Sequence, residues 1–227
     1  MLTFVLAESG LELCPREVWS HPSVKKSAES RGKEAGEILL DRSLHHKAML
    51  VLRDQYKRGR PDIAHISLLE ATGTPLYKMN MLKVYIHTIN DRVIEVGEGV
   101  RLPKTFYRFQ GVMEKLLLEG SVGSEGRTLL RVWDQDFHGL IDRVRPDVVL
   151  GYTRLGMPMT IEDSVRPLLE AERPMVVIGG FSRGHFSREV SMHLTYTVAI
   201  STMPLEAHVV IARSLYEYEK AVLKVVE

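Results

Sequence analysis

Apolar residues in this chain form short runs that alternate with stretches of helical periodicity. The short runs are typical of buried strands and lie at 3–7, 82–87, 93–96, 128–133, 147–150, 175–178 and 197–200. The stretches with helical spacing lie at 45–56, 64–71, 105–118, 161–172 and 205–222. Strands that alternate with helices predict an α/β fold, in which a mostly parallel sheet is covered by helices on both faces.

Three segments depart from this alternation. Asn90 and Asp91 separate two strand runs, which predicts an inserted antiparallel β-hairpin over 80–100. Residues 15–42 are mostly small, polar or charged, above all between 23 and 36, and we expect a mobile surface loop there. Its lysines could contact a polyanion, although a solvated loop is the simpler interpretation. Residues 119–126 contain three glycines and predict a linker between a helix and the next strand.

The composition is that of a globular protein. With 227 residues, of which 44% are hydrophobic and 26% charged, the chain predicts one compact domain over 1–227. No apolar run approaches the ~20 residues that span a membrane, and the first six residues lack the basic flank of a secretory signal. We therefore expect a cytoplasmic protein without a membrane partner. The single cysteine, Cys14, excludes an internal disulfide and a cysteine metal cluster, and we expect no bound metal.

Basic residues gather on one face of the predicted helix over 105–118. At 100° per residue, Lys104, Arg108, Gly111 and Lys115 fall within a narrow sector, and Arg101 precedes the helix on the same side. The net charge of +1 does not by itself suggest a nucleic acid partner. A basic face without interleaved acids, however, suits the successive phosphates of a nucleic acid backbone. A solvated helix face and a site for RNA or another polyanion are equally good interpretations of this pattern.

The sequence Arg60-Pro61-Asp62 predicts the start of a helix. Proline fits the first turn, and the carboxylate complements the helix N-terminus. In one interpretation Asp62 only caps the helix and Arg60 only pairs with it. In the other, the carboxylate holds the guanidinium in a fixed orientation toward a base edge or a phosphate.

Two loops near the C-terminus predict a small-molecule pocket. The run 175–178 leads into Gly179-Gly180-Phe181-Ser182-Arg183-Gly184, and the run 197–200 breaks at Ser201-Thr202-Met203-Pro204-Leu205. Glycines let main-chain groups approach a ligand, so loops after two adjacent strands favour a pocket for an adenine or ribose. Dinucleotide-binding folds place their glycine loop after the first strand instead, which argues against that class.

Other catalytic classes receive no support. His45 and His46 are expected on a helix surface, and His185, His193 and His208 lack metal-ligand spacing. The chain has no His-Glu-x-x-His motif, Walker loop or Gly-x-Ser-x-Gly elbow. A hydrolase or a metal enzyme is therefore not indicated.

Taken together, these motifs resemble a known family. Phe4-Val5-Leu6-Ala7-Glu8, Arg58-Gly59-Arg60-Pro61-Asp62-Ile63, the stretch from Arg101 to Gly111 and the two C-terminal loops follow the order found in the ribosome-biogenesis pseudouridine-N1 methyltransferases of the SPOUT superfamily. The chain is most similar to the compact archaeal-type members. The resemblance implies an α/β fold with a deep C-terminal trefoil knot that binds S-adenosylmethionine. It also implies methyl transfer to N1 of a pseudouridine in small-subunit (16S-type) rRNA, with a role in ribosome biogenesis.

The resemblance also assigns residues. Arg60 and Asp62 become the catalytic pair, in which Asp62 orients Arg60 and, being paired, is a weak proton acceptor. The rRNA contacts fall on Arg60, Arg101, Lys104 and Arg108, where a lysine at 104 keeps the charge but not bidentate geometry. The cofactor contacts fall on Gly179, Gly184, Ile200, Ser201, Thr202, Met203, Pro204 and Leu205.

A homodimer is the last expectation. The helix over 205–222 is apolar nearly all round and must be covered on more than one side. The chain's own helices could do this, but the resemblance implies a dimer that pairs through the knot and completes each active site across the interface. Two other functions stay open: a non-catalytic rRNA-binding ribosome-assembly factor, and an unrelated α/β nucleotide-binding protein.

Overall fold

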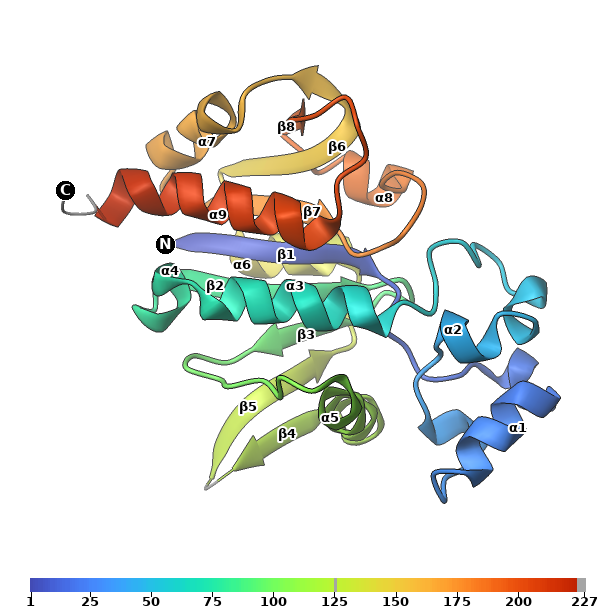
Figure 1. Ribbon diagram of the computed structural model, residues 1–227. Coiled ribbons are helices and arrows are strands. Elements are labelled where there is room, and N and C mark those ends of the chain that lie inside the picture. The colour runs from blue at the N-terminus through green and yellow to red at the C-terminus, as the bar shows by residue number, and fades with distance from the viewer. Residues whose placement is uncertain (125, 224–227) are drawn as a thin grey trace.

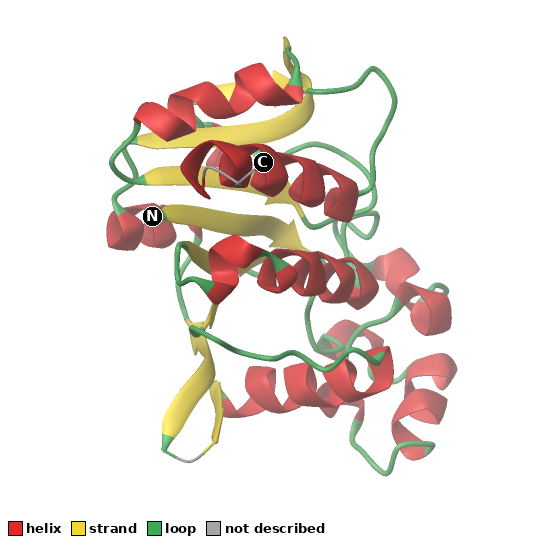
Figure 2. Cartoon of the chain, turned by 60° about the vertical axis from the view of Figure 1, so that its left-hand side comes forward, coloured by secondary structure: helices red, strands yellow, loops and turns green. Residues whose placement is uncertain are grey.

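The protein is built on one twisted mixed sheet with helices on both faces (Figures 1 and 2). The computed structural model describes residues 1–124 and 126–223. The strands of the described chain are β1 Leu2–Ser9, β2 Leu82–Thr88, β3 Val93–Val96, β4 Ser121–Ser124, β5 Arg127–Trp133, β6 Val148–Pro158, β7 Pro174–Gly179 and β8 Tyr196–Ala199. The helices are α1 Pro22–Glu29, α2 Arg42–His45, α3 Pro61–Gly73, α4 Pro75–Lys78, α5 Phe106–Glu119, α6 Phe137–Val144, α7 Ile161–Glu170, α8 Arg188–Ser191 and α9 Ala207–Leu223.

The sheet has the order β4-β5-β3-β2-β1-β7-β6-β8. Its β2–β1–β7–β6–β8 portion is parallel throughout, whereas β3, β5 and β4 extend it with antiparallel pairings. The hairpin predicted over 80–100 corresponds to β2 and β3, which pair antiparallel from Val84↔Val96 to His87↔Val93. Because β1 has parallel neighbours on both sides, its carboxyl end lies beside those of β2 and β7.

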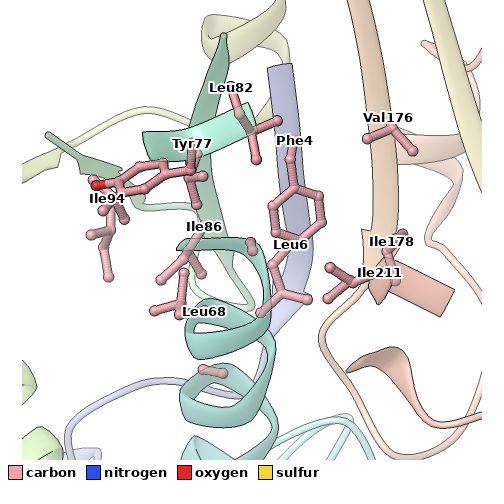
Figure 3. Packing of buried hydrophobic residues seen from close by; sticks show 14 of the residues in the cluster. Phe4, Leu6, Leu68, Tyr77, Leu82, Ile86, Ile94, Val176, Ile178 and Ile211 are labelled. Carbon is pink, nitrogen blue, oxygen red and sulfur yellow. The ribbon is translucent and has the colours of Figure 1, made fainter. Parts of the chain in front are cut away.

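Alternate residues of β1 supply the cores on the two faces of the sheet. Phe4 and Leu6 join a large cluster with α3, α5, α7 and α9, and Figure 3 shows both pointing into it with Leu68 and Ile211. Val5 and Ala7 face the other way and pack with side chains of α6 and α8. This alternation is the two-residue period of a strand that is buried on both faces. The apolar run that predicted a buried strand at 3–7 therefore forms part of the core on both faces of the sheet.

The predicted loop over 15–42 is wrong, because this segment contains ordered helices. It includes 3-10 turns at Arg16–Val18 and Ala35–Glu37 as well as α1. Val24 and Ala28 on α1 are buried in a separate small core with Ile38 and Leu40. Val24 and Ala28 are four positions apart and therefore share one face of α1. The mostly polar composition of the segment gave no clear sign of this face.

Two ion pairs with one buried carboxylate attach the same segment to α5. Arg31 donates to both carboxylate oxygens of Glu114 at 2.5 and 2.6 Å, and Lys33 donates at 2.6 Å. The main-chain N–H of Leu39 adds a fourth hydrogen bond at 2.9 Å. Glu114 is fully buried, so these donors are what permits its charge inside the protein.

The continuous helix predicted over 45–56 is also wrong. The chain forms α2, a 3-10 turn at Ala48–Val51 and further turns. His45, expected on a helix surface, is 1% exposed. Its Nδ1 accepts a hydrogen bond from the Asp41 main chain, and its Nε2 lies 3.0 Å from the Ser27 hydroxyl. These contacts hold the end of α2 against α1. The chain therefore turns after His45 and does not continue as one long helix.

Three further findings complete the comparison with the predicted elements. The expected linker over 119–126 contains β4, which pairs antiparallel with β5. Strands β7 and β8 are not adjacent, because β6 lies between them. No helix of the described chain is long and apolar enough to cross a membrane.

Candidate active site at the carboxyl edge of the sheet

A cavity of about 170 Å³ lies beyond the carboxyl ends of β7 and β8. It is bordered by the loop after β7, the loop between β8 and α9, and the middle of β6. Both loops border the same cavity although β6 separates their strands. Tyr152, Thr153 and Arg154 of β6 line the part of the cavity between the two loops. Ligands of open parallel sheets bind at this edge, where the loops leave the strands.

Most of the residues expected to contact the cofactor line this cavity. They are Gly179, Gly184, Ile200, Ser201, Met203, Pro204 and Leu205. Thr202 was expected with them but is not part of the lining. Apolar walls from Ile178, Val198 and Val210 adjoin main-chain groups of both loops. This combination fits a ligand with a flat ring and an aliphatic chain, such as S-adenosylmethionine.

Gly184 has a backbone conformation that requires glycine. Its φ of 104° lies in the left-handed half of conformational space, where side chains are strained. A Cβ at this position would lie 3.1 Å from the ring of Tyr56. The loop therefore closes tightly over the turn that leads to Arg60.

Arg60 and Asp62 form a bidentate ion pair at the start of α3. Arg60 Nε and Nη2 donate to the two Asp62 oxygens at 2.9 and 2.7 Å. Burial of Asp62 acts to raise its pKa, but the hydrogen bonds and charge of Arg60 outweigh this effect and leave the pKa below its usual value. Asp62 is therefore ionised at neutral pH and is a poor proton acceptor. The stabilisation from a depressed pKa is complete above the unfolded value of about 3.9 and is lost only as pH falls through the folded value.

Main-chain hydrogen bonds connect Arg60 to the cofactor loop of its own chain. The Gly10 N–H donates to the Gly180 carbonyl at 3.2 Å, and the Arg60 N–H donates to the Gly10 carbonyl at 3.1 Å. A Cβ on Gly10 would lie 2.6 Å from the Lys57 carbonyl oxygen, so only glycine permits this approach. Hydrogen bonds to Asp62 raise the pKa of Arg60 against the effect of burial, and the charge of Glu206, beside Leu205, adds to this. The main chain of Arg60 is thus connected through Gly10 to the loop that borders the cavity, although Arg60 is not among the residues that line it.

The exposed basic residues Arg101, Lys104 and Arg108 lie at and just before the start of α5. None of the three takes part in an ion pair within the described chain. Lys115, further along the helix, lies 3.8 Å from Glu119. Gly111 faces open space, so these side chains flank a bare patch of helix backbone.

His65 connects this basic surface to α3. Its Nε2 donates to the Pro103 carbonyl at 2.8 Å, and its ring packs against Phe106 and Phe109. The basic surface is thus held against the helix that begins with Arg60 and Asp62. Tyr107 is 74% exposed in the same stretch, an aromatic side chain that the charge pattern alone did not single out.

Two buried acids near Arg60 were not predicted as site residues. Glu12 accepts two hydrogen bonds from Arg58 at 2.7 and 2.5 Å and one from the Asn90 amide at 2.7 Å. Glu8 accepts one from Lys57 at 3.0 Å. The sequence offered one signal for these two acids. Glu8 follows an apolar strand run, and Glu12 comes four residues later. Groups of three or more metal-ligating side chains do not occur among the described residues.

Comparison with known proteins agrees with this architecture. Residues 4–219 match the model of the EMG1/NEP1 methyltransferase family. The Ribosomal RNA small subunit methyltransferase Nep1 of Staphylothermus marinus is 39% identical over 93% of this chain and 92% of its own. The protein of the same name from Thermococcus onnurineus is 37% identical over 98% of this chain and 100% of its own.

A solved structure supports the same conclusion. It is described as the crystal structure of Archaeoglobus fulgidus Nep1 bound to S-adenosylhomocysteine. Its TM-score to this protein is 0.86, with 36% identity, covering 96% of this chain and 97% of the other. The predicted α/β fold of the SPOUT type is confirmed, whereas the knot and the dimer stay predictions. This chain therefore belongs to the EMG1/NEP1 methyltransferase family.

Proposed function

We propose that this protein transfers a methyl group from S-adenosylmethionine to small-subunit rRNA, and that the acceptor is N1 of a pseudouridine. The observation that carries the proposal is the connection, through Gly10, between the cofactor cavity and the Arg60–Asp62 pair. The names of the relatives, and the S-adenosylhomocysteine in the similar Archaeoglobus structure, support the cofactor and the class of RNA. We expect this reaction to serve ribosome biogenesis in the cytoplasm.

The chemistry asks the protein mainly for alignment. S-adenosylmethionine supplies an activated methyl group when bound. Its expected site is the cavity lined by Gly179, Gly184 and the residues of 200–205 other than Thr202. Pseudouridine differs from uridine in carrying an N–H at ring position 1, which is a nucleophile once its proton is lost. The base must be unpaired and turned outward for this nitrogen to reach the methyl group. Holding both partners in place can supply a large part of the rate.

Arg60 is the residue best suited to the substrate side. As N1 loses its proton to solvent water, negative charge would spread to the ring carbonyl oxygens, where a fixed guanidinium would stabilise it. Transfer of the methyl group to N1 would leave S-adenosylhomocysteine as the second product. Asp62 orients Arg60 rather than taking the proton, because its pKa is held below the usual value. The exposed cations Arg101, Lys104 and Arg108 would contact phosphates of the rRNA.

A homodimer is also proposed, although α9 gives it less support than expected. Val210, Ile211, Leu215 and Tyr218 are buried within the chain, and α9 packs between α3 and α7 (Figure 1). Better support comes from large apolar side chains near the cavity and at the β8 edge of the sheet. Leu155, Met157, Tyr196 and Met203 are 47–73% exposed, which is unusual for a group of apolar residues on one side of a monomer.

The reaction is tested with two matched rRNA hairpins, one carrying uridine and one pseudouridine at the same position. Incubation with labelled S-adenosylmethionine should transfer label only to the pseudouridine hairpin, because only that base has an N–H at position 1. Equal labelling of both would contradict the proposed acceptor. Tight binding of both hairpins without transfer would favour the non-catalytic assembly factor.

Arg60→Ala should lower kcat/KM about 10²–10³-fold, as loss of one fixed donor to a developing anion does elsewhere. The dissociation constant of S-adenosylhomocysteine, measured by calorimetry, should change less than twofold. Asp62→Asn should show a milder form of the same defect. Arg53→Ala is the matched control, since its side chain is 95% exposed on the preceding turn. A larger defect in Asp62→Asn than in Arg60→Ala would instead indicate that the carboxylate takes the proton.

Replacing Arg101, Lys104 and Arg108 together by alanine should lower the affinity for RNA. It should also make that affinity less dependent on salt concentration. Each lost phosphate contact lowers the log–log salt slope by roughly 0.7, so three should lower it by about 2. Lys78→Ala/Lys83→Ala serves as control, because both lysines are exposed near the opposite, amino edge of the sheet. A parental affinity and slope in the triple variant would identify the basic surface as a solvated helix face.

Light scattering at micromolar concentration should give twice the chain mass of 25.8 kDa. Met157→Lys/Met203→Lys should shift the mass toward the monomer, since charges in an apolar interface are left without partners. Tyr216→Lys, at an exposed position on α9, should leave the mass unchanged. A monomeric mass for the fully active parent would refute the dimer.

A further inference from the structure

A buried ion pair lies directly beneath the loop that follows β7. Glu8 is 4% exposed and Lys57 is 6% exposed, and Lys57 Nζ lies 3.0 Å from Glu8 Oε2. Neither residue lines the cavity, so neither is expected to touch the cofactor. The two residues are 49 positions apart and join the carboxyl end of β1 to the turn before Arg60.

Both members of the pair also bind the cofactor loop. The Ser187 N–H, where this loop ends, donates to the two Glu8 oxygens at 3.2 and 3.1 Å. The Lys57 ammonium lies 4.6 Å from the ring centre of Phe181, a cation–π contact near the start of the loop. Phe181 packs in turn against Gly179 at the start of the loop. The pair therefore contacts the loop near its start and at its end.

The turn that carries Lys57 contacts the loop a second time. The Ser182 hydroxyl donates to the Tyr56 carbonyl at 3.1 Å, and Gly184 lies over the Tyr56 ring. Three residues after Lys57 the chain reaches Arg60. A shift of Lys57 would therefore move the cofactor loop and the guanidinium relative to each other.

The pair is difficult to explain by stability alone. Replacing a buried ion pair by apolar groups of similar volume is often neutral or stabilising, because desolvation offsets the attraction. Glu8 also has a φ of 50°, a strained conformation for a residue with a side chain. Its main-chain N–H donates to His87 Nδ1 at 3.3 Å, a contact that holds this conformation. Strain and buried charge at the edge of a ligand cavity are typical of a site held in a fixed geometry.

We propose that Glu8 and Lys57 are positioning residues, which hold the loop between Gly179 and Ser187 in its ligand-binding form and set its distance from Arg60. The proposal rests on the proposed function, because it assumes that this loop binds the cofactor. It predicts that neutralising the pair weakens cofactor binding without removing any group that touches the cofactor.

The experiment compares two double variants of matched chemistry. Glu8→Gln/Lys57→Met removes both charges beneath the loop at nearly constant volume. Arg31→Met/Glu114→Gln likewise neutralises a buried carboxylate and its cation between α5 and residues 31–39, away from the cavity, and it also leaves Lys33 without a partner. S-adenosylhomocysteine affinity is measured by calorimetry, and folding is followed by thermal unfolding.

The first variant should bind S-adenosylhomocysteine at least tenfold more weakly at a Tm close to that of the parent. The second should lower Tm while its dissociation constant changes less than twofold. Saturating cofactor should restore only part of kcat in the first variant, because Arg60 is displaced as well. A folded Glu8→Gln/Lys57→Met protein with parental affinity would overturn the proposal.

Lys57→Arg covers the case in which the neutral variant does not fold. It keeps the charge but replaces a compact ammonium with a planar fork, so it should fold and still weaken cofactor binding. Parental affinity in this variant would also overturn the proposal. The proposed function fails separately, since in that case the parent protein itself would not bind S-adenosylhomocysteine.

Discussion

Parallel pairing of β1 with β7 is the constraint on which the candidate site depends. It brings the carboxyl end of the first strand, with Glu8 and Gly10, beside the carboxyl end of a strand about 170 residues later. The Gly10 carbonyl then accepts a hydrogen bond from the Arg60 N–H, and the Gly10 N–H donates one to the Gly180 carbonyl. Without this strand pairing, Glu8 would not reach the Ser187 N–H, and Gly10 would not connect the loop after β7 to the main chain of Arg60. The chemistry is therefore located by backbone geometry before any side chain contributes.

Buried carboxylates provide the second organising interaction. Between the end of β1 and the start of α3 the chain leaves the sheet, and four cations of this segment bind buried acids. Arg31 and Lys33 bind Glu114, Lys57 binds Glu8, and Arg58 binds Glu12. Each acid is buried and would be destabilising without its partner. These pairs fix where this segment lies, and with it the turn that presents Arg60 beside the basic start of α5.

The sequence predicted the parts of the structure that depend on local pattern. All strands of the described chain except β4, together with α5, α9, the Arg60–Asp62 pair and most of the cavity lining, follow from apolar periodicity, turn chemistry and recognisable motifs. The helices over 15–42 were missed because only Val24 and Ala28 of α1 are buried, too few to form a visible period. The cationic partners of Glu8 and Glu114 lie 49 to 83 positions away, so no local rule relates them. The insertion of β6 between β7 and β8 is likewise a matter of topology, which spacing along the chain does not contain.

The contact between the first and a late strand has a consequence for how the protein is made. Leu6 leaves the ribosome 172 residues before its neighbour Ile178. At a synthesis rate of about 5–20 residues per second, β1 waits roughly 10–35 s for its partner on one side. During that time β1 pairs with β2 on one edge, and the opposite edge, where β7 will pair, stays open. The cavity is thus among the last features to form, and a chain interrupted before β8 would hold much of the sheet but no site.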